Sequence, residues 1–244
     1  MDIFDLSGRT AVVTGASSGI GEAIAGALAE AGAHVIALGR DERRLGAVAA
    51  RIGGVAVAAD LTDVDPVIAA IRSHAEVVDI LVNAAGTNPR PPFGDQDSAS
   101  YHDVLAVNLH AAYELGHSFG PEMAERGWGR IVNIGSQQQH RAFGNSGAYG
   151  VAKAGLAGLT RSQSEAWARY GVRVNTIVPG LIRTRMTQAL LEDPERVDYF
   201  EQRSHVGRLG EAADFAGLAV LLCSDAAAFI TGQAICVDGG FSVT

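Results

Sequence analysis

The sequence has few cysteines, a deficit of basic residues and no long hydrophobic run. Its two cysteines, Cys223 and Cys236, stand in apolar segments without a CxxC spacing, so we expect buried, reduced thiols and no disulfide or redox site. No apolar run approaches the roughly 18 residues that cross a bilayer, so we expect no membrane partner.

Basic residues are outnumbered: lysine and arginine total 19 against 27 aspartate and glutamate, which gives a net charge of −8. The densest basic group, from Arg40 to Arg44, is interrupted by two acids, so nucleic acid is not an expected partner. Residues 1–5 are acidic and lack the basic segment of a signal peptide, so a cytoplasmic protein is expected. We expect no metal site.

What the sequence does contain is an alternation of short apolar runs and helix-length segments. The runs are rich in valine and isoleucine, as in parallel strands covered on both faces; they span 10–14, 34–38, 55–58, 80–83, 131–134, 173–178 and 234–237. Helices are predicted over 21–31, 63–75, 101–126, 149–170 and 212–223. This pattern predicts an α/β, doubly wound Rossmann fold: a single seven-stranded parallel sheet with helices on both faces.

One domain covering residues 1–244 is expected, because no repeat, low-complexity tract or Pro/Gly linker divides the chain. The least regular stretch is 181–208, which mixes arginine, threonine, methionine and glutamate with weak apolar spacing. Such a segment in a compact fold is more often a lid or binding loop than core. We therefore predict a substrate lid there.

A glycine-rich loop joins the first predicted strand to an alanine-rich helix. Gly15, Gly19 and Gly21 follow a GxxxGxG spacing, which suits a tight turn, a close approach to a pyrophosphate and close helix–strand packing. The helix N-terminus offers partial positive charge to the phosphates. Because no Gly-Lys-Ser/Thr follows, a dinucleotide is a better ligand than ATP.

Further motifs follow the loop in order: "NAAG" at 83–86, Asn108, Ser136, Tyr149 with Lys153 as YxxxK, "PG" at 179–180 before Thr184, and "VDGG" at 237–240. Together with TGxxxGxG at 14–21, they resemble the short-chain dehydrogenase/reductase family, in its shorter-chained branch, over essentially the whole chain. Within that family the chain resembles the polyol and gluconate-type dehydrogenases. The resemblance implies an NAD(P)-dependent oxidoreductase that acts on CH–OH donors.

The resemblance assigns catalytic roles to Asn108, Ser136, Tyr149 and Lys153. Tyr149 would be the general acid/base at the carbinol or carbonyl oxygen; since a free tyrosine has a pKa of about 10, the Lys153 ammonium would favour its phenolate. Helix positions i and i+4 share a face, which brings the two side chains together. Ser136 would donate to the substrate oxygen, and Asn108 would hold a water that relays protons to Lys153.

The resemblance also implies a cofactor site along the carboxyl ends of the strands. Asp60 and Leu61 would flank the adenine, although loop capping is an alternative role for Asp60 and for Asn83. The residues expected on the adenosine side are Asn83, Ala84 and Gly86, and those at the carboxamide are Gly180, Ile182 and Thr184. The full predicted set is Gly15, Ser17, Ser18, Gly19, Ile20, Gly21, Arg40, Asp60, Leu61, Asn83, Ala84, Gly86, Tyr149, Lys153, Pro179, Gly180, Ile182 and Thr184.

The end of the second predicted strand indicates which dinucleotide binds. A NAD-specific site carries an acidic residue there, roughly 20 residues after the glycine loop. Gly39 stands at that place and Arg40 follows, which could pair with a 2′-phosphate and stack on adenine. NADP(H) is therefore favoured. NAD(H) stays an alternative, because Ser18 is neutral and Asp41 could serve as a ribose acceptor.

Polar residues near the predicted serine point to a hydrophilic substrate. The resemblance implies that Gln138, two residues after the serine, faces the substrate. Gln137 and Gln139 are equally well explained as cover of a solvated loop, and His140 as a surface residue. Amides and hydroxyls suit a polyhydroxylated molecule, because a buried amide facing carbon would stay unpaired. The predicted substrate contacts are Arg90, Ser136, Gln138, Asn145 and Tyr149.

Arg90 stands in "GTNPRPPF", the loop after the NAAG motif. It could bind the carboxylate of a sugar acid, as the gluconate and deoxygluconate dehydrogenases of the family carry basic residues in the same loop. It could equally be a surface arginine held by the neighbouring prolines.

The sequence therefore predicts hydride transfer between a nicotinamide cofactor and a secondary alcohol or ketone of a polyol, sugar or sugar acid. A 3-oxoacyl-[acyl-carrier-protein] reductase is the enzymatic alternative; the acidic net charge disfavours it, since the carrier protein is itself acidic. A non-catalytic dinucleotide-binding regulator is the alternative of another class. The small-residue face over 152–158 suits the homotetramer or homodimer that the resemblance implies.

Overall fold

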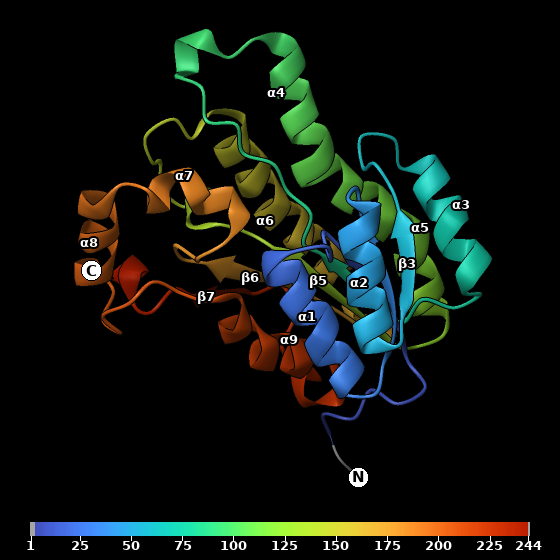
Figure 1. Ribbon diagram of the computed structural model, residues 1–244. Coiled ribbons are helices and arrows are strands. Elements are labelled where there is room, and N and C mark those ends of the chain that lie inside the picture. Colours follow the sequence, from blue (N-terminus) through green and yellow to red (C-terminus); the bar gives the residue numbers. More distant parts are fainter. Residues whose placement is uncertain (1–2, 244) are drawn as a thin grey trace.

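Seven parallel strands form the sheet on which the molecule is built (Figure 1). In the computed structural model, which describes residues 3–243, they are β1 Thr10–Thr14, β2 His34–Gly39, β3 Val55–Ala58, β4 Ile80–Asn83, β5 Gly129–Ile134, β6 Val172–Pro179 and β7 Ala234–Val237. Their order in space is β3-β2-β1-β4-β5-β6-β7, and every neighbouring pair is parallel. The predicted doubly wound sheet is confirmed, and its order reverses between β1 and β4.

Helices cover both faces of this sheet (Figure 1). One face carries α1 Gly19–Glu30, α2 Glu42–Ile52 and α9 Ala216–Cys223; the other carries α3 Asp65–His74, α5 Ala111–Glu125 and α6 Gly147–Trp167. A separate apolar cluster lies under each layer, with Ile24 and Phe215 in the first and Leu115 and Phe119 in the second. The strands are continuously apolar because both of their faces are covered.

The segment predicted as one helix over 101–126 is helical without a break from Ser98 to Glu125, but a π-helical turn interrupts its α-helical geometry. It consists of α4 Ser98–Leu105, a single π-helical turn Ala106–His110, and α5. A π turn accommodates an extra residue and re-aims its side chains, which apolar spacing does not reveal. Asn108 lies on this turn. The helix α2 was absent from the predicted segments.

The irregular stretch predicted as a lid folds into short helical pieces beside the C-terminus (Figure 1). They are a 3₁₀ turn Arg185–Thr187, α7 Gln188–Leu191 and α8 Pro194–Arg203. At its base an isolated bridge joins Ile182 to Gly210, and Arg183 forms an ion pair with Glu201 at 3.0 Å. The two ends of the stretch therefore lie side by side at the carboxyl edge of the sheet.

The two cysteines differ in exposure. Cys223 is fully buried, as expected, whereas Cys236 is exposed, so the prediction was wrong for Cys236. The reason is that β7 is an edge strand whose alternate residues, Ala234 and Cys236, face outward. Across residues 3–243, no helix is both long and apolar enough to cross a membrane.

Candidate active site

The loop between β1 and α1 is so tight that two of its glycines admit no side chain. Gly15 has φ +67°, and a Cβ there would lie 2.8 Å from the backbone of Ala85. A Cβ on Gly21 would lie 2.5 Å from the Gly15 carbonyl oxygen. Thr14 Oγ1 accepts hydrogen bonds from the backbone N–H groups of Ala84 and Ala85 at 3.0 and 3.1 Å. The ends of β1 and β4 are thus joined where a doubly wound sheet binds its ligand.

The N-terminus of α1 opens onto this edge without a side-chain cap. Ser18 occupies the capping position, but its hydroxyl makes no capping hydrogen bond. The first N–H groups of the helix are therefore available to an anion such as a phosphate. Gly19, at φ +60°, lies under the lid, because a Cβ there would be 3.2 Å from Thr184 Cγ2. The lid, which is far from this loop in sequence, thus lies against the loop next to the start of α1.

The end of β2 leaves little room for an acidic ribose ligand. A Cβ on Gly39 would lie 3.1 Å from Ser17 Oγ. Asp41 is engaged elsewhere, since it caps α2 by accepting from Arg44 N at 3.1 Å and pairs with the Arg44 guanidinium at 3.2 Å. Arg40 is exposed and makes no hydrogen bond or ion pair within the described residues. Its charge is the one available to a ligand at this place.

Asp60 follows β3 and caps its own loop. Its Oδ1 accepts from the backbone N–H and the hydroxyl of Thr62, both at 3.0 Å. These hydrogen bonds lower the pKa of Asp60, and the nearby charge of Arg40 lowers it further. The capping role that the sequence left open is therefore present, and an adenine contact stays a prediction.

Ser136, Tyr149 and Lys153 come together at the carboxyl end of β5. Ser136 begins a 3₁₀ turn, and its Oγ accepts from Gln138 N at 3.2 Å. On α6, Lys153 Nζ lies 5.5 Å from the centroid of the Tyr149 ring. Lys153 is 3% exposed, and its ammonium donates to the Ile134 carbonyl oxygen at 2.7 Å. The serine, the tyrosine and the lysine are thus held by one strand end and one helix.

Opposing effects set the pKa of Tyr149. Burial raises this pKa, whereas a side-chain hydrogen bond with Ser136 and the positive charge of Arg90 lower it. Burial also lowers the pKa of Lys153 to about 8. A general base must be deprotonated near the working pH, so the effects of Ser136 and Arg90 on this pKa both favour the role predicted for Tyr149. That electrostatic effect was predicted for Lys153 alone; the effect of Arg90 depends on how its loop folds.

Asn108 is locked in place on the π turn. Its Nδ2 donates to the carbonyl oxygens of Val104 and Thr87, both at 2.9 Å, and its Oδ1 accepts from Thr87 N at 3.3 Å. A cavity of about 10 Å³ lies between Asn108, Lys153 and Asn83, whose Oδ1 is buried without a partner. Such a volume suits a single water molecule. The predicted relay water thus has a space, and its presence stays a prediction.

This chain matches known proteins over nearly its whole length. A family model described as "Enoyl-(Acyl carrier protein) reductase" matches residues 15–242. A gluconate 5-dehydrogenase of Gluconobacter oxydans is 37% identical over 251 residues, which cover 100% of this chain and 98% of the relative. A galactitol 2-dehydrogenase (L-tagatose-forming) of Cereibacter sphaeroides is 37% identical over 250 residues, with 99% and 98% covered.

Among solved structures, a gluconate 5-dehydrogenase from Burkholderia cenocepacia in complex with NADP and tartrate superposes with a TM-score of 0.94 at 32% identity, covering 100% of this chain and 98% of that one. The chain belongs to the short-chain dehydrogenase/reductase family. It is therefore an oxidoreductase, and the expected ordered motifs of that family lie on the expected elements.

The three glutamines after the serine of this short-chain dehydrogenase/reductase have three different environments. Gln137 is buried, and its Nε2 donates to Asp238 Oδ2 at 2.8 Å, so its interpretation as cover of a solvated loop was wrong. The Oε1 atoms of Gln138 and Gln139 are buried without a partner. Gln139 Nε2 lies 2.9 Å from Nε2 of His140, which is an exposed residue.

The loop after β4 supplies another polar group that the sequence analysis missed. Asn88 Oδ1 is buried and has no partner, and no pattern in the sequence distinguishes it from a surface asparagine. Arg90 is exposed, has φ +56° and makes no hydrogen bond or ion pair within residues 3–243. Asn145 is also exposed, with φ +59°, and lies just before α6. Left-handed backbone is uncommon for residues other than glycine; here Arg90 lies in an irregular loop and Asn145 in the turn before α6.

The remaining predicted cofactor residues lie along the same carboxyl edge. Gly180 follows β6, and a Cβ there would lie 2.9 Å from Asp238 Cα. Leu61 and Ile182 are 8% and 4% exposed, so their side chains belong mainly to the apolar interior. Asn83 Nδ2 donates to Asn133 Oδ1 at 2.8 Å, which joins β4 to β5.

Three more of the predicted cofactor residues lie nearby. They are Ile20, which packs beside the core under α1, Gly86, which is next to Asn108, and Pro179, the last residue of β6. Their contacts with a cofactor stay predictions.

Proposed function

We propose that this enzyme reversibly oxidises a secondary hydroxyl of a sugar acid or polyol with NADP(H) as cofactor. The observation that carries the substrate class is Arg90: an unpaired guanidinium in the loop after β4 whose charge reaches the buried Tyr149 hydroxyl. Unpartnered amide oxygens of Asn88 and Gln138 accompany it. A molecule with a carboxylate and several hydroxyls offers partners to all three groups.

The dinucleotide fits the residues present. The glycine loop is a cradle that a Cβ at Gly15 or Gly21 would fill, and the uncapped start of α1 lies next to it. Arg40, with Gly39 before it, supports the NADP form, because a guanidinium can bind a 2′-phosphate bidentately. The related gluconate 5-dehydrogenase structure holds NADP. When bound, the nicotinamide supplies the hydride acceptor.

The residues of the chain supply orientation and proton transfer. Tyr149 Oη takes the hydroxyl proton of the substrate, and Ser136 Oγ donates a hydrogen bond to the same oxygen. Lys153, fixed on the Ile134 carbonyl, keeps a donor beside the tyrosine ring. Asn108 borders the small cavity next to Lys153, through which the proton would reach a water. Burial of Tyr149 and Lys153 strengthens these interactions because little water competes for them.

Arg90 provides the test of the substrate class. We expect Arg90→Met to raise the KM for an aldonate, such as gluconate, by roughly 30-fold, because a charge-assisted pair is worth about 2 kcal/mol. The KM for the matching neutral alditol should change by less than about threefold. Arg169→Met, at an exposed arginine after α6, is the matched control and should change neither value. Equal effects of Arg90→Met on both substrates would contradict the carboxylate assignment.

Three further expectations belong to this proposal. The alternative substrate is a 3-oxoacyl thioester of an acyl carrier protein. The loss of NADPH absorbance with an acetoacetyl thioester as substrate tests this alternative. A homotetramer or homodimer is proposed from the resemblance and from the small residues over 152–158. A cytoplasmic location is proposed from the sequence alone.

A further inference from the structure

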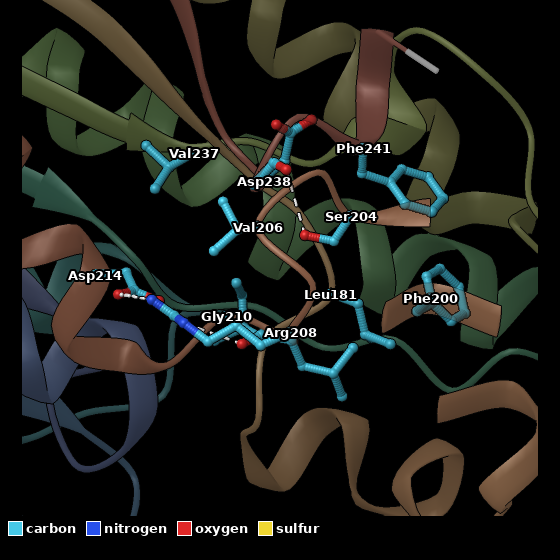
Figure 2. A pocket seen from close by; sticks show the side chains of 13 residues that line it. Leu181, Phe200, Ser204, Val206, Arg208, Gly210, Asp214, Val237, Asp238 and Phe241 are labelled. Atoms are coloured by element: carbon cyan, nitrogen blue, oxygen red, sulfur yellow. Dashed lines mark hydrogen bonds and ion pairs between the residues drawn. The ribbon is translucent and has the colours of Figure 1, made fainter. Parts of the chain in front are cut away.

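The C-terminal segment, residues 238–243, lies between the loop that carries Ser136 and the lid. A cavity of about 200 Å³ lies where the C-terminal segment meets the lid. Asp238 and Phe241 border it from the C-terminal segment, and Phe200, Ser204 and Val206 border it from the lid (Figure 2). The segment comes more than a hundred residues after the serine in sequence. Hydrogen bonds join the segment to the serine loop on one side and to the lid on the other.

On the serine side, Gln137 makes the contact. It is 6% exposed, and its Nε2 donates to Asp238 Oδ2 at 2.8 Å. Asp238 is itself held, because it accepts from the backbone N–H groups of Gly240 and Ser242 at 3.0 and 2.9 Å. A second hydrogen bond, from Arg141 to the Ser242 carbonyl oxygen at 2.8 Å, joins the same two segments further along.

Gln137 is the first residue of the 3₁₀ turn that Ser136 caps. Ser136 Oγ accepts from Gln138 N at 3.2 Å, and Gln139 N donates to the Ser136 carbonyl oxygen at 3.0 Å. Gln137 and Ser136 are joined by one peptide unit, and two hydrogen bonds hold the backbone of the same turn. The anchored Gln137 side chain therefore restricts how far the turn that carries Ser136 can shift.

On the lid side, the C-terminal segment makes backbone and aromatic contacts. The Gly239 carbonyl oxygen accepts from Val206 N at 3.2 Å and from Ser204 Oγ at 3.3 Å. The rings of Phe241 and Phe200 stack with centroids 5.4 Å apart. Gly239 has φ +62°, and a Cβ there would lie 2.5 Å from Ser204 Oγ, so the two segments approach as closely as glycine allows.

We propose that Gln137 is a positioning residue that orients the Ser136 hydroxyl, and that Asp238 links this position to the lid. The proposal rests on the proposed function, since it assigns Gln137 a role through the serine that contacts the substrate oxygen. Gln137 does not itself contact the reacting atoms. The C-terminal segment thereby contacts both the lid and the turn that carries the Ser136 hydroxyl.

The test compares kinetics of Gln137→Leu, Gln137→Glu and Asp238→Asn. Gln137→Leu should lower kcat by about tenfold, as expected when a reacting group is misplaced by a fraction of an ångström. Gln137→Glu should do the same, because two carboxylates would then face each other. Asp238→Asn should also lower kcat, because its amide NH2 would face one of the backbone N–H groups of Gly240 and Ser242 that donate to the two Asp238 oxygens.

A pH profile separates positioning from general damage. The Ser136 hydrogen bond lowers the pKa of Tyr149, so its loss should move the midpoint of kcat/KM for alcohol oxidation to higher pH in Gln137→Leu. Lys153 and Arg90, the charged groups beside Tyr149, stay in place in every variant. The dissociation constant for NADP⁺ should remain within about twofold. Arg141→Gln, which breaks the second contact of the same loop, is the control and should keep the native midpoint.

The outcomes are distinct. An unshifted midpoint in Gln137→Leu at a native melting temperature would overturn the positioning role. A shifted midpoint in Gln137→Leu, together with the native midpoint in Arg141→Gln, supports it. Failure of the proposed function shows differently, because the native enzyme would then turn over neither sugar acids nor polyols.

Discussion

The two edges of the sheet carry polar clusters of opposite character. At the amino edge, around the starts of β1, β5 and β6, the charged groups are satisfied by ion pairs or by backbone carbonyl groups. At the carboxyl edge, where β1, β2, β4 and β5 end, acceptors and cations lack partners. Of the five buried side-chain polar atoms without a partner within residues 3–243, four lie at or after the ends of β4 and β5: those of Asn83, Asn88, Gln138 and Gln139.

Arg130 is the centre of the amino edge. It is 3% exposed, forms an ion pair with Asp225 at 3.0 Å and donates to the carbonyl oxygen of Ser224 at 2.9 Å. Two guanidinium groups contact the Trp128 ring, with Arg9 at 3.7 Å and Arg130 at 4.3 Å from its centroid. Burial lowers the pKa of Arg130 to about 10, which leaves it charged at neutral pH. The polar and charged groups around Arg130 satisfy one another's hydrogen bonds and charges, so no ligand is required there.

Buried polar groups are normally satisfied, so a concentration of unsatisfied ones requires an explanation. At the carboxyl edge the explanation is a ligand that supplies the missing partners. We therefore expect substitutions at the amino edge to lower stability, and substitutions at the carboxyl edge to lower activity while stability is unchanged or raised. This difference is called the separation of the edges.

The largest effect is expected from Tyr149→Phe. Removing the hydroxyl that exchanges the proton should lower kcat by about 10³-fold, within the range for loss of a general acid/base. The dissociation constant for NADP⁺ should stay within about threefold, as measured by quenching of protein fluorescence. Retention of more than a tenth of the native kcat would show that the tyrosine is not the acid/base, and a non-catalytic regulator would show no turnover before or after the change.

At the amino edge, Arg130→Met should lower the free energy of unfolding by about 2–3 kcal/mol, because buried carbonyl groups lose a charged donor. Asp225 is 64% exposed and is rehydrated, which keeps the loss below that of a fully buried pair. Urea unfolding measures the change. Arg51→Met, which breaks the exposed pair with Glu22, is the control and should cost less than about 1 kcal/mol. A fall in kcat/KM of the folded Arg130 variant beyond twofold would break the separation of the edges.

Lys153 gives a pH-dependent stability difference. Its pKa is about 8 in the folded protein, against an ordinary value of 10.5, so between these values the unfolded chain binds the extra proton and stability rises with pH. Lys153→Met removes this penalty. The variant should be more stable than the native protein by roughly 1–2 kcal/mol at pH 7, and the advantage should shrink between pH 8 and 10. An advantage that does not change with pH would refute the assignment.

The smallest effect on stability is expected from Gln138→Leu. Removing a buried carbonyl without a partner should leave the free energy of unfolding unchanged or raise it by about 0.5–1 kcal/mol. The KM for a polyol should nevertheless rise about tenfold, because the substrate loses that acceptor. Gln163→Leu is the matched control: its Oε1 is also buried and unpartnered, but it lies on α6 against Gly116. Equal KM effects of the two substitutions would contradict a substrate contact at Gln138.

The strands were predictable because parallel strands covered on both faces are continuous apolar runs. The predicted runs match the observed strands to within two residues at every end. The largest difference is at β5, which begins at Gly129 instead of 131, since Arg130 is a polar residue buried against Asp225. No local pattern reveals a partner that lies 95 residues away.

The proximity of Ser136, Tyr149 and Lys153 was predictable because their motifs are local and ordered. The three side chains meet as the spacing indicated, and their catalytic roles stay predictions. The partner of Gln137 could not be predicted, because Asp238 lies 101 residues away and the contact depends on how the C-terminal segment packs. The charge of Arg90 at Tyr149 depends in the same way on the fold of the loop after β4.

The proposed oxidation of sugar acids and polyols is tested most directly by the rate at which the native enzyme reduces NADP⁺ with gluconate and with the matching alditol. The appearance of reduced nicotinamide absorbance is the signal. We expect turnover of both compounds, with the lower KM for gluconate because only gluconate has a carboxylate that can bind Arg90. No turnover of either compound, together with NADPH-dependent reduction of an acetoacetyl thioester, would contradict it.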